Sequence, residues 1–191
     1  VRVAGTLPRA ERGSLRPLAD PLRLVAREIE ALDHRHWPRR LAAATRLAVL
    51  ADRDAVLPLV RALDDPLLDV RLAAARALAE LEAPEGVEPI LRALALPGEL
   101  PSRLAADALM AMGDAAVEPL CAYLGREHAE DELALVVVAV QVLCQRGAAS
   151  AADALVALLG HPNAELRLNA ARALGQVGAA SALEPLCRAA Q

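Results

Sequence analysis

The sequence contains no phenylalanine and no lysine, and its only aromatic residues are one tryptophan and one tyrosine. A core without aromatic side chains must be built from aliphatic ones, and alanine, leucine and valine supply most of the 55% hydrophobic content. Alanine and leucine favour close helix packing, whereas strands are enriched in β-branched and aromatic residues. The composition therefore predicts an all-α fold and excludes a sheet-based one.

Because lysine is absent, all 21 basic residues are arginine, which we interpret as the codon preference of a GC-rich genome. The net charge of −4 is unevenly distributed. Residues 1–50 carry ten arginines and five acidic residues, whereas residues 51–191 carry eleven arginines and twenty acidic residues. A duplex nucleic-acid binder needs a basic stripe that neutralises phosphates. The acidic part of the chain points to protein partners instead.

Cysteine is also scarce. Cys121, Cys144 and Cys187 form no CxxC pair, which argues against a zinc site and a disulfide framework and fits a reduced, cytoplasmic compartment. The longest apolar run, Leu133 to Val140, is far shorter than the roughly 20 residues that span a bilayer. The sequence begins at Val1 and not at methionine, so we expect membrane association only through a segment missing upstream, which the basic first 50 residues would flank.

What the sequence does contain is an internal repeat. Val70–Leu78 reads VRLAAARAL and Leu166–Leu174 reads LRLNAARAL, with seven of nine positions identical. Five copies align on anchor leucines that are 31, 31, 34 and 31 residues apart: Leu47, Leu78, Leu109, Leu143 and Leu174. A period of about 32 residues is typical of stacked helical hairpins.

A second helical pattern lies between the copies, and in most repeats proline occurs near its start. The first turn of a helix tolerates proline because its missing N–H would have no partner there. The prolines at this position are Pro58, Pro89, Pro119 and Pro185. We therefore predict an irregular segment at residues 1–19 and a repeat domain at residues 20–191. Its hairpins are expected at about 20–51, 54–82, 86–113, 116–146 and 151–178, with a last helix at 182–190.

The stretches DPLLDVRLAAARALAEL and HPNAELRLNAARALGQVG resemble HEAT repeats of the short bacterial type that also occur in phycocyanobilin-lyase-like proteins. The resemblance covers roughly residues 20–191. It implies a right-handed α-solenoid, an alpha–alpha superhelix, of about five hairpins. It also implies a structural ladder between neighbouring repeats, here formed by Asp69 with Arg71 and by Glu165 with Arg167.

The middle of the array departs from this pattern. Ser102 and Val136 stand where the third and fourth copies would carry the ladder arginine, which predicts a broken ladder and irregular stacking. The longer spacing of the fourth copy predicts a bulging loop at Gly125–Glu132. The helix expected at Glu132–Arg146 is apolar almost all round, so it is either enclosed by flanking repeats, which we prefer, or a self-association patch.

In such a superhelix the second helices of the repeats line the concave face. The position after the ladder arginine, normally polar in the family, is apolar in four of five repeats: Leu41, Leu72, Arg103, Val137 and Leu168. One turn further along are Thr45, Arg76, Asp107, Gln141 and Arg172. This pattern predicts an apolar strip flanked by polar groups, which suits an amphipathic helix or an extended peptide. The alternative is that neighbouring repeats bury the strip.

No catalytic motif is visible. The most varied cluster, Asp33 to Trp37, offers too few ligands for a usual closed metal site, so we interpret it as an inter-helix turn whose Trp37 caps the first repeat. His128 and His161 are interpreted as solvated loop residues.

These observations favour a non-enzymatic scaffold or adaptor, without a cofactor, that binds a protein or peptide on the concave face. Two alternatives stay open. The resemblance implies a bilin or chromophore lyase-like or other enzyme-accessory role, and the basic first 50 residues suit the cytoplasmic domain of a membrane-anchored protein.

Overall fold

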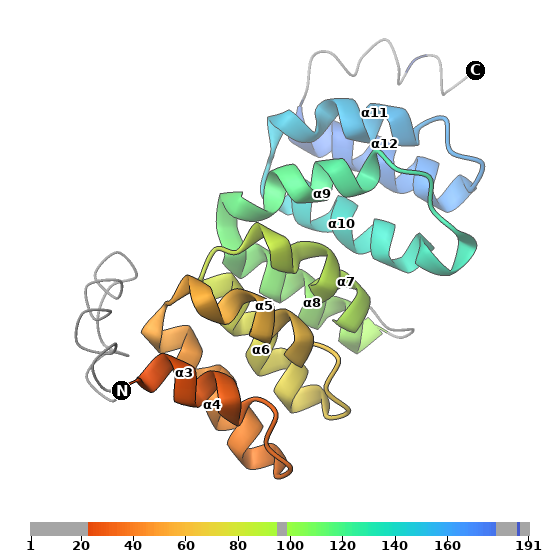
Figure 1. Ribbon diagram of the computed structural model, residues 1–191. Helices are drawn as coiled ribbons and strands as arrows, with labels where there is room; N and C mark the ends of the chain where they lie inside the picture. Colours follow the sequence, from red (N-terminus) through yellow and green to blue (C-terminus); the bar gives the residue numbers. More distant parts are fainter. Residues whose placement is uncertain (1–22, 95–98, 179–186, 188–191) are drawn as a thin grey trace. The chain divides into compact units, whose positions relative to one another are not determined.

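The computed structural model describes residues 23–94, 99–178 and Cys187, and every regular element among them is helical (Figure 1). This confirms the all-α prediction. The α-helices are α3 (Leu24–Ala31), α4 (Trp37–Leu50), α5 (Val56–Ala62), α6 (Leu68–Glu80), α7 (Val87–Leu94), α8 (Glu99–Met112), α9 (Val117–Leu124), α10 (Leu133–Gln145), α11 (Ala152–Leu158) and α12 (Ala164–Val177). The predicted segment 1–19 and the predicted helix 182–190, except Cys187, lie outside the described residues.

Two compact units make up the chain, Val1–Leu94 and Ala95–Gln191, and each is considered by itself below. The boundary falls inside the hairpin predicted at 86–113. We call α3, α5, α7, α9 and α11 the first helices, and α4, α6, α8, α10 and α12 the second helices.

Short 3₁₀ turns precede four of the first helices. They are η3 (Arg53–Ala55), η4 (Pro84–Gly86), η5 (Gly113–Ala116) and η7 (Ala149–Ala151). Pro58, Pro89 and Pro119 each occupy the third residue of the α-helix that follows. Backbone N–H groups in the first turn have no partner within the helix, so proline costs no hydrogen bond there.

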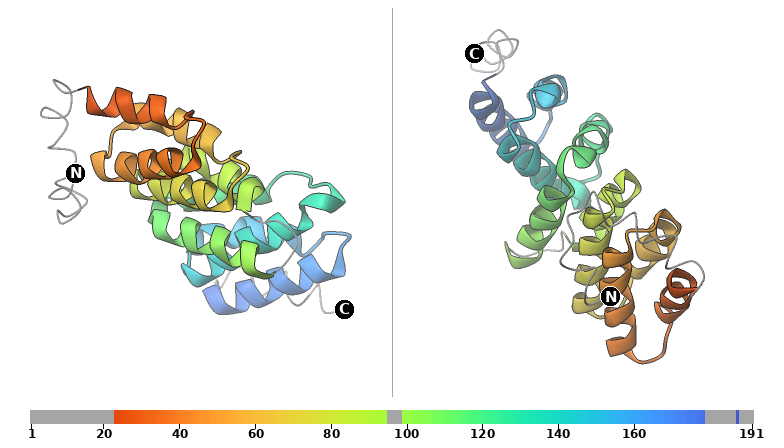
Figure 2. Two further views of the ribbon diagram at one scale, coloured as in Figure 1. Left: turned by 90° about the horizontal axis from the view of Figure 1, so that it is seen from below. Right: turned by 90° about the vertical axis from the view of Figure 1, so that its left-hand side faces the viewer.

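In the first unit, α4 and α6 lie side by side, and α3 and α5 pack against them (Figures 1 and 2). Alanines make this close approach possible, since Ala44 and Ala74 are fully buried together with the anchor residues Leu47 and Leu78. Each buried leucine contributes roughly 1.5–3 kcal/mol relative to an exposed one. The sequence repeat therefore reflects one helix–helix packing contact that successive hairpins make with equivalent residues.

In the second unit, α10 is enclosed by α8, α9 and α12. Seven of its residues are buried, among them Val136, which occupies the position of the missing ladder arginine. Its nearly uniform apolar surface is thus explained by enclosure, the first of the two interpretations. The side chain of Ser102 lies outside what the structure describes. No helix in the described ranges is long and apolar enough to cross a membrane.

Candidate protein-binding surface

The arginines near the start of the second helices hold the turns that precede them. Arg40 Nη1 donates to the carbonyl of His34 at 2.9 Å, Arg71 Nη1 to that of Asp65 at 3.1 Å, and Arg167 Nη1 to that of His161 at 2.9 Å. In all three cases the acceptor lies six residues earlier. The shared spacing shows that each arginine closes its own inter-helix turn.

The same turns are capped by a side chain that accepts the N–H two residues on. His34 Nδ1 accepts from His36 N at 3.0 Å, Asp65 Oδ1 from Leu67 N at 2.9 Å, and His161 Nδ1 from Asn163 N at 3.0 Å. This corrects the interpretation of His161 as a solvated loop residue, because its half-buried ring is a structural acceptor. In two of the turns an imidazole nitrogen thus accepts the hydrogen bond that a carboxylate oxygen accepts in the third.

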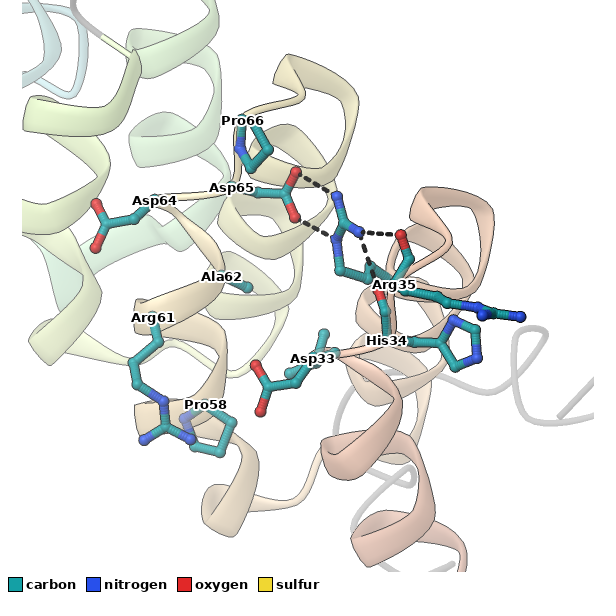
Figure 3. A pocket seen from close by; sticks show the side chains of 11 residues that line it. Asp33, His34, Arg35, Pro58, Arg61, Ala62, Asp64, Asp65 and Pro66 are labelled. Atoms are coloured by element: carbon teal, nitrogen blue, oxygen red, sulfur yellow. Dashed lines mark hydrogen bonds and ion pairs between the residues drawn. The ribbon is translucent and has the colours of Figure 1, made fainter.

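An ion pair joins the first two repeats (Figure 3). Arg40 binds Asp65 with two hydrogen bonds, Nε–Oδ2 at 2.5 Å and Nη2–Oδ1 at 3.0 Å, and the side chains are only 14% and 6% exposed. Burial acts to raise the pKa of Asp65, but the hydrogen bonds from Arg40 and from the Leu67 N–H outweigh it and hold that pKa below its usual value.

This pair differs from the ladder that the resemblance implied. Among the described residues, Arg71 and Arg167 donate to backbone carbonyls of the turns before their own helices and form no ladder with Asp69 or Glu165. The observed inter-repeat contact instead joins residues 25 apart, from the start of α4 to the turn before α6. Asp69 and Glu165 are exposed and make no side-chain ion pair within the described part of the chain.

A hollow of about 370 Å³ lies beside the Arg40–Asp65 pair, between the first two turns (Figure 3). Its lining includes exposed Asp33, Arg61 and Asp64. Across residues 23–94 and 99–178, no group of three or more His, Cys, Asp or Glu is placed to hold a metal ion. Desolvation and the cations around it lower the pKa of His34, which suits its role as a neutral acceptor in the turn.

In the first unit, the predicted concave-face residues meet in one groove between α4 and α6. This α4–α6 groove has a volume of about 360 Å³ and is lined by Leu41, Thr45, Ala48, Asp69, Leu72, Ala73 and Arg76. Leu41 and Leu72 are half-buried, so the apolar strip is partly accessible. Arg76 is exposed and has no ion-pair partner among the described residues.

In the second unit, two adjoining hollows between α10 and α12 share Val137 and Gln141, and we call them together the α10–α12 groove. One, of about 210 Å³, contains Cys144, Asn169, Arg172 and Gln176. The other, of about 300 Å³, contains Leu133, Asn163 and Glu165. Three further predicted residues, Arg103, Asp107 and Leu168, are exposed but line neither hollow.

The exposure of two apolar residues near the starts of α4 and α6 was not predicted from the sequence. Trp37 was expected to cap the first repeat, but its side chain is 44% exposed at the start of α4, one turn before Leu41. Leu67, 40% exposed, is the residue just before α6 and lies five positions from Leu72. Helical spacing could have placed Trp37 on the face of Leu41, since residues four apart on a helix share a face.

His128 also corrects an interpretation, because its side chain is only 1% exposed and not solvated. The connection from Gly125 to η6 (Glu130–Glu132) places the ring 4.7 Å from that of Tyr123, centroid to centroid. The Arg126 guanidinium lies 4.5 Å from the centroid of the Tyr123 ring. The loop, although its sequence is polar, thus contains a buried contact between the rings of His128 and Tyr123.

The solved structures that are similar to this chain include a lyase complex and an engineered protein. The chain is similar to a solved complex of CpcE and CpcF of phycocyanin lyase from Nostoc sp., at 26% identity and a TM-score of 0.46, over 78% of this chain and 63% of that chain. An engineered protein is similar at 24% identity and a TM-score of 0.48, over 87% of this chain and 85% of that one. No curated protein matches the chain.

The family comparison covers most of the sequence. The model for HEAT repeats matches residues 26–100 and 134–191, and the model for the PBS lyase HEAT-like repeat matches residues 103–126. The matched ranges contain all five anchor leucines and the α4–α6 groove. The chain therefore belongs to the HEAT-repeat family.

Proposed function

We propose that this protein is a non-catalytic scaffold that binds another protein through the grooves between its second helices. The observation that carries the proposal is that both units present three equivalent register positions in an open groove. Leu41, Thr45 and Arg76 in one unit correspond to Val137, Gln141 and Arg172 in the other. Apolar side chains beside charges without partners are what a partner's amphipathic segment would cover.

The position of the grooves suits a protein partner. Sites for small molecules are concave and enclose most of their ligand. The hollows between the second helices measure about 210, 300 and 360 Å³ and lie in the furrows between neighbouring helices. Such furrows accommodate a row of side chains from a second protein.

The titratable groups support a non-catalytic role. Catalytic sites are where pKa values are strongly perturbed for a chemical task. Here the shifts of His34, Arg40 and Asp65 follow from holding a turn and an inter-repeat contact. Burial raises the pKa of Cys144, the thiol in the α10–α12 groove, which keeps it in the poorly nucleophilic protonated form.

Within this proposal the protein acts in the cytoplasm. Cys121, Cys144 and Cys187 are free thiols, and free thiols persist in a reducing compartment.

Site-specific photo-crosslinking tests the proposal. A benzoylphenylalanine at Thr45, in the α4–α6 groove, should crosslink to a protein in extracts of the source cells. The same probe at Leu57, which is 67% exposed on the first helix α5, is the matched control and should not. Equal crosslinking at both positions, or none at Thr45, would show that the groove is not the binding surface.

A further inference from the structure

We infer that each groove receives an amphipathic helix of the partner, which carries an acidic and a basic residue two turns apart on its apolar face. The inference rests on the proposed function and specifies the partner's chemistry. It starts from two pairs of charges, Asp69 with Arg76 and Glu165 with Arg172, which stand seven residues apart and in equivalent positions of two repeats.

These four charges are available to a partner. All are exposed, and none makes a side-chain ion pair in the described ranges. Asp69 and Arg76 both line the α4–α6 groove. Glu165 and Arg172 line the two hollows of the α10–α12 groove, which meet at Val137 and Gln141. Each groove therefore has a carboxylate at one end, a guanidinium at the other, and apolar side chains between them.

The spacing of the charges selects a helix over an extended peptide. Seven residues of α-helix rise about 10.5 Å and return to nearly the same face. In an extended peptide, residues three apart are separated by about 10 Å but point to opposite sides, whereas residues two or four apart are separated by about 6.6 or 13 Å. A helix with charges at positions i and i+7 reproduces both the spacing and the face.

The helix dipole selects the orientation. A partner helix is more stable with its acidic residue near the N-terminus and its basic residue near the C-terminus. Such a helix faces Asp69 with its basic residue and Arg76 with its acidic residue only when it lies antiparallel to α6. Leucines at i+3 and i+4 are then placed to contact Leu41 and Leu72, and exposed Trp37, one turn before Leu41 on α4, would extend the apolar contact.

The experiment uses three labelled alanine-based helical peptides with leucine at i+3 and i+4. One carries Glu at i and Arg at i+7, the second carries Arg at both positions, and the third Glu at both. Fluorescence anisotropy at low salt should show at least about fivefold tighter binding of the Glu/Arg peptide to the full chain than of either other peptide.

Two variants locate the effect. Arg76→Asp leaves the α4–α6 groove with two carboxylates and should shift its preference to the Arg/Arg peptide. Arg61→Asp makes the same change of net charge on the exposed face of α5 and should leave the order of affinities unchanged.

The outcomes separate the inference from the proposed function. Equal binding of all three peptides, abolished by Leu72→Glu, would overturn the inference while the groove stayed a binding surface. Binding of no peptide would also overturn the inference, and failure of the Thr45 crosslink would remove the proposed function itself. Self-association of the chain that blocks the peptides would assign the groove to a second copy and overturn the inference.

Discussion

The Arg40–Asp65 pair should be the strongest polar link between the first two repeats. Removing one partner leaves the other poorly solvated, since the carboxylate is only 6% exposed. Breaking a buried pair costs about 3–5 kcal/mol, and the partial exposure of Arg40 places this one near the lower end. We expect each single variant, Arg40→Met or Asp65→Asn, to lower the free energy of unfolding by about 3 kcal/mol, with a coupling energy of about 2 kcal/mol in the double-mutant cycle.

The assay is urea unfolding followed by the fluorescence of Trp37, which lies one turn before Arg40 on α4 and is the only tryptophan. Urea is preferred to guanidinium because it does not screen charges. Asparagine at position 65 keeps an acceptor for the Leu67 N–H, so the cycle isolates the ion pair. The control cycle is Arg46 with Glu28, a more exposed pair at 3.1 Å that should couple by less than about 1 kcal/mol. Equal coupling in the two cycles would refute the reasoning.

Three further predictions concern pH and packing. The pKa of Asp65 is lower in the folded than in the unfolded chain, so the stability that Asp65 contributes is present above the unfolded pKa of about 3.9 and is lost as the pH falls through the folded pKa. Asp65→Asn should therefore reduce the fall of the urea midpoint between pH 6 and pH 3. An unchanged dependence of the midpoint on pH would contradict this. Gly86→Ala should lower the free energy of unfolding by about 1–3 kcal/mol, because the new Cβ would lie 3.0 Å from Leu78 Cδ1. Gly175→Ala within α12 should raise it by about 0.5–1 kcal/mol, because its Cβ would meet nothing within 4 Å. Thermal melts that rank the two variants the other way would contradict the packing of Gly86 against Leu78. His128→Phe should raise the melting temperature, since neither buried ring nitrogen makes a hydrogen bond, the contact of Nδ1 with the Glu132 carboxylate is long at 3.5 Å, and the ring contact with Tyr123 is kept. A lower melting temperature would show that the imidazole, through its contact with Glu132, stabilises the loop.

The repeat and its core were predictable because burial follows helical periodicity directly. Leu47 and Leu78 are both fully buried, as their equivalent positions require. The α4–α6 groove followed from the same register, since Leu41, Leu72 and Arg76 share one face of their helices. Leu168 shows the limit of that reasoning. Leu168 has the register of Leu72, but it is 49% exposed and lies outside the α10–α12 groove. The position of a residue within its repeat does not determine how closely the neighbouring helix packs beside it.

The ion pair and the buried histidine were not predictable from spacing. Asp65 rather than Asp69 carries the inter-repeat contact because the turn before α6 aims its carboxylate at Arg40, and turn geometry is a three-dimensional property. His128 stands in the strongly polar stretch GREHAEDE, which resembles a solvated loop. Its burial depends on the loop folding back over Tyr123, a contact that local polarity does not reveal.

The central claim is that a protein partner binds the face between α4 and α6. The most direct measurement is the affinity of the partner crosslinked through Thr45, determined by calorimetry for the unaltered chain, for Leu72→Glu and for Leu57→Glu, with helicity checked for each. A carboxylate in the floor of the groove should weaken binding at least tenfold, a loss of about 1.4 kcal/mol or more, whereas the exposed α5 position should change affinity by less than about threefold. Equal affinities of the two variants would contradict the account.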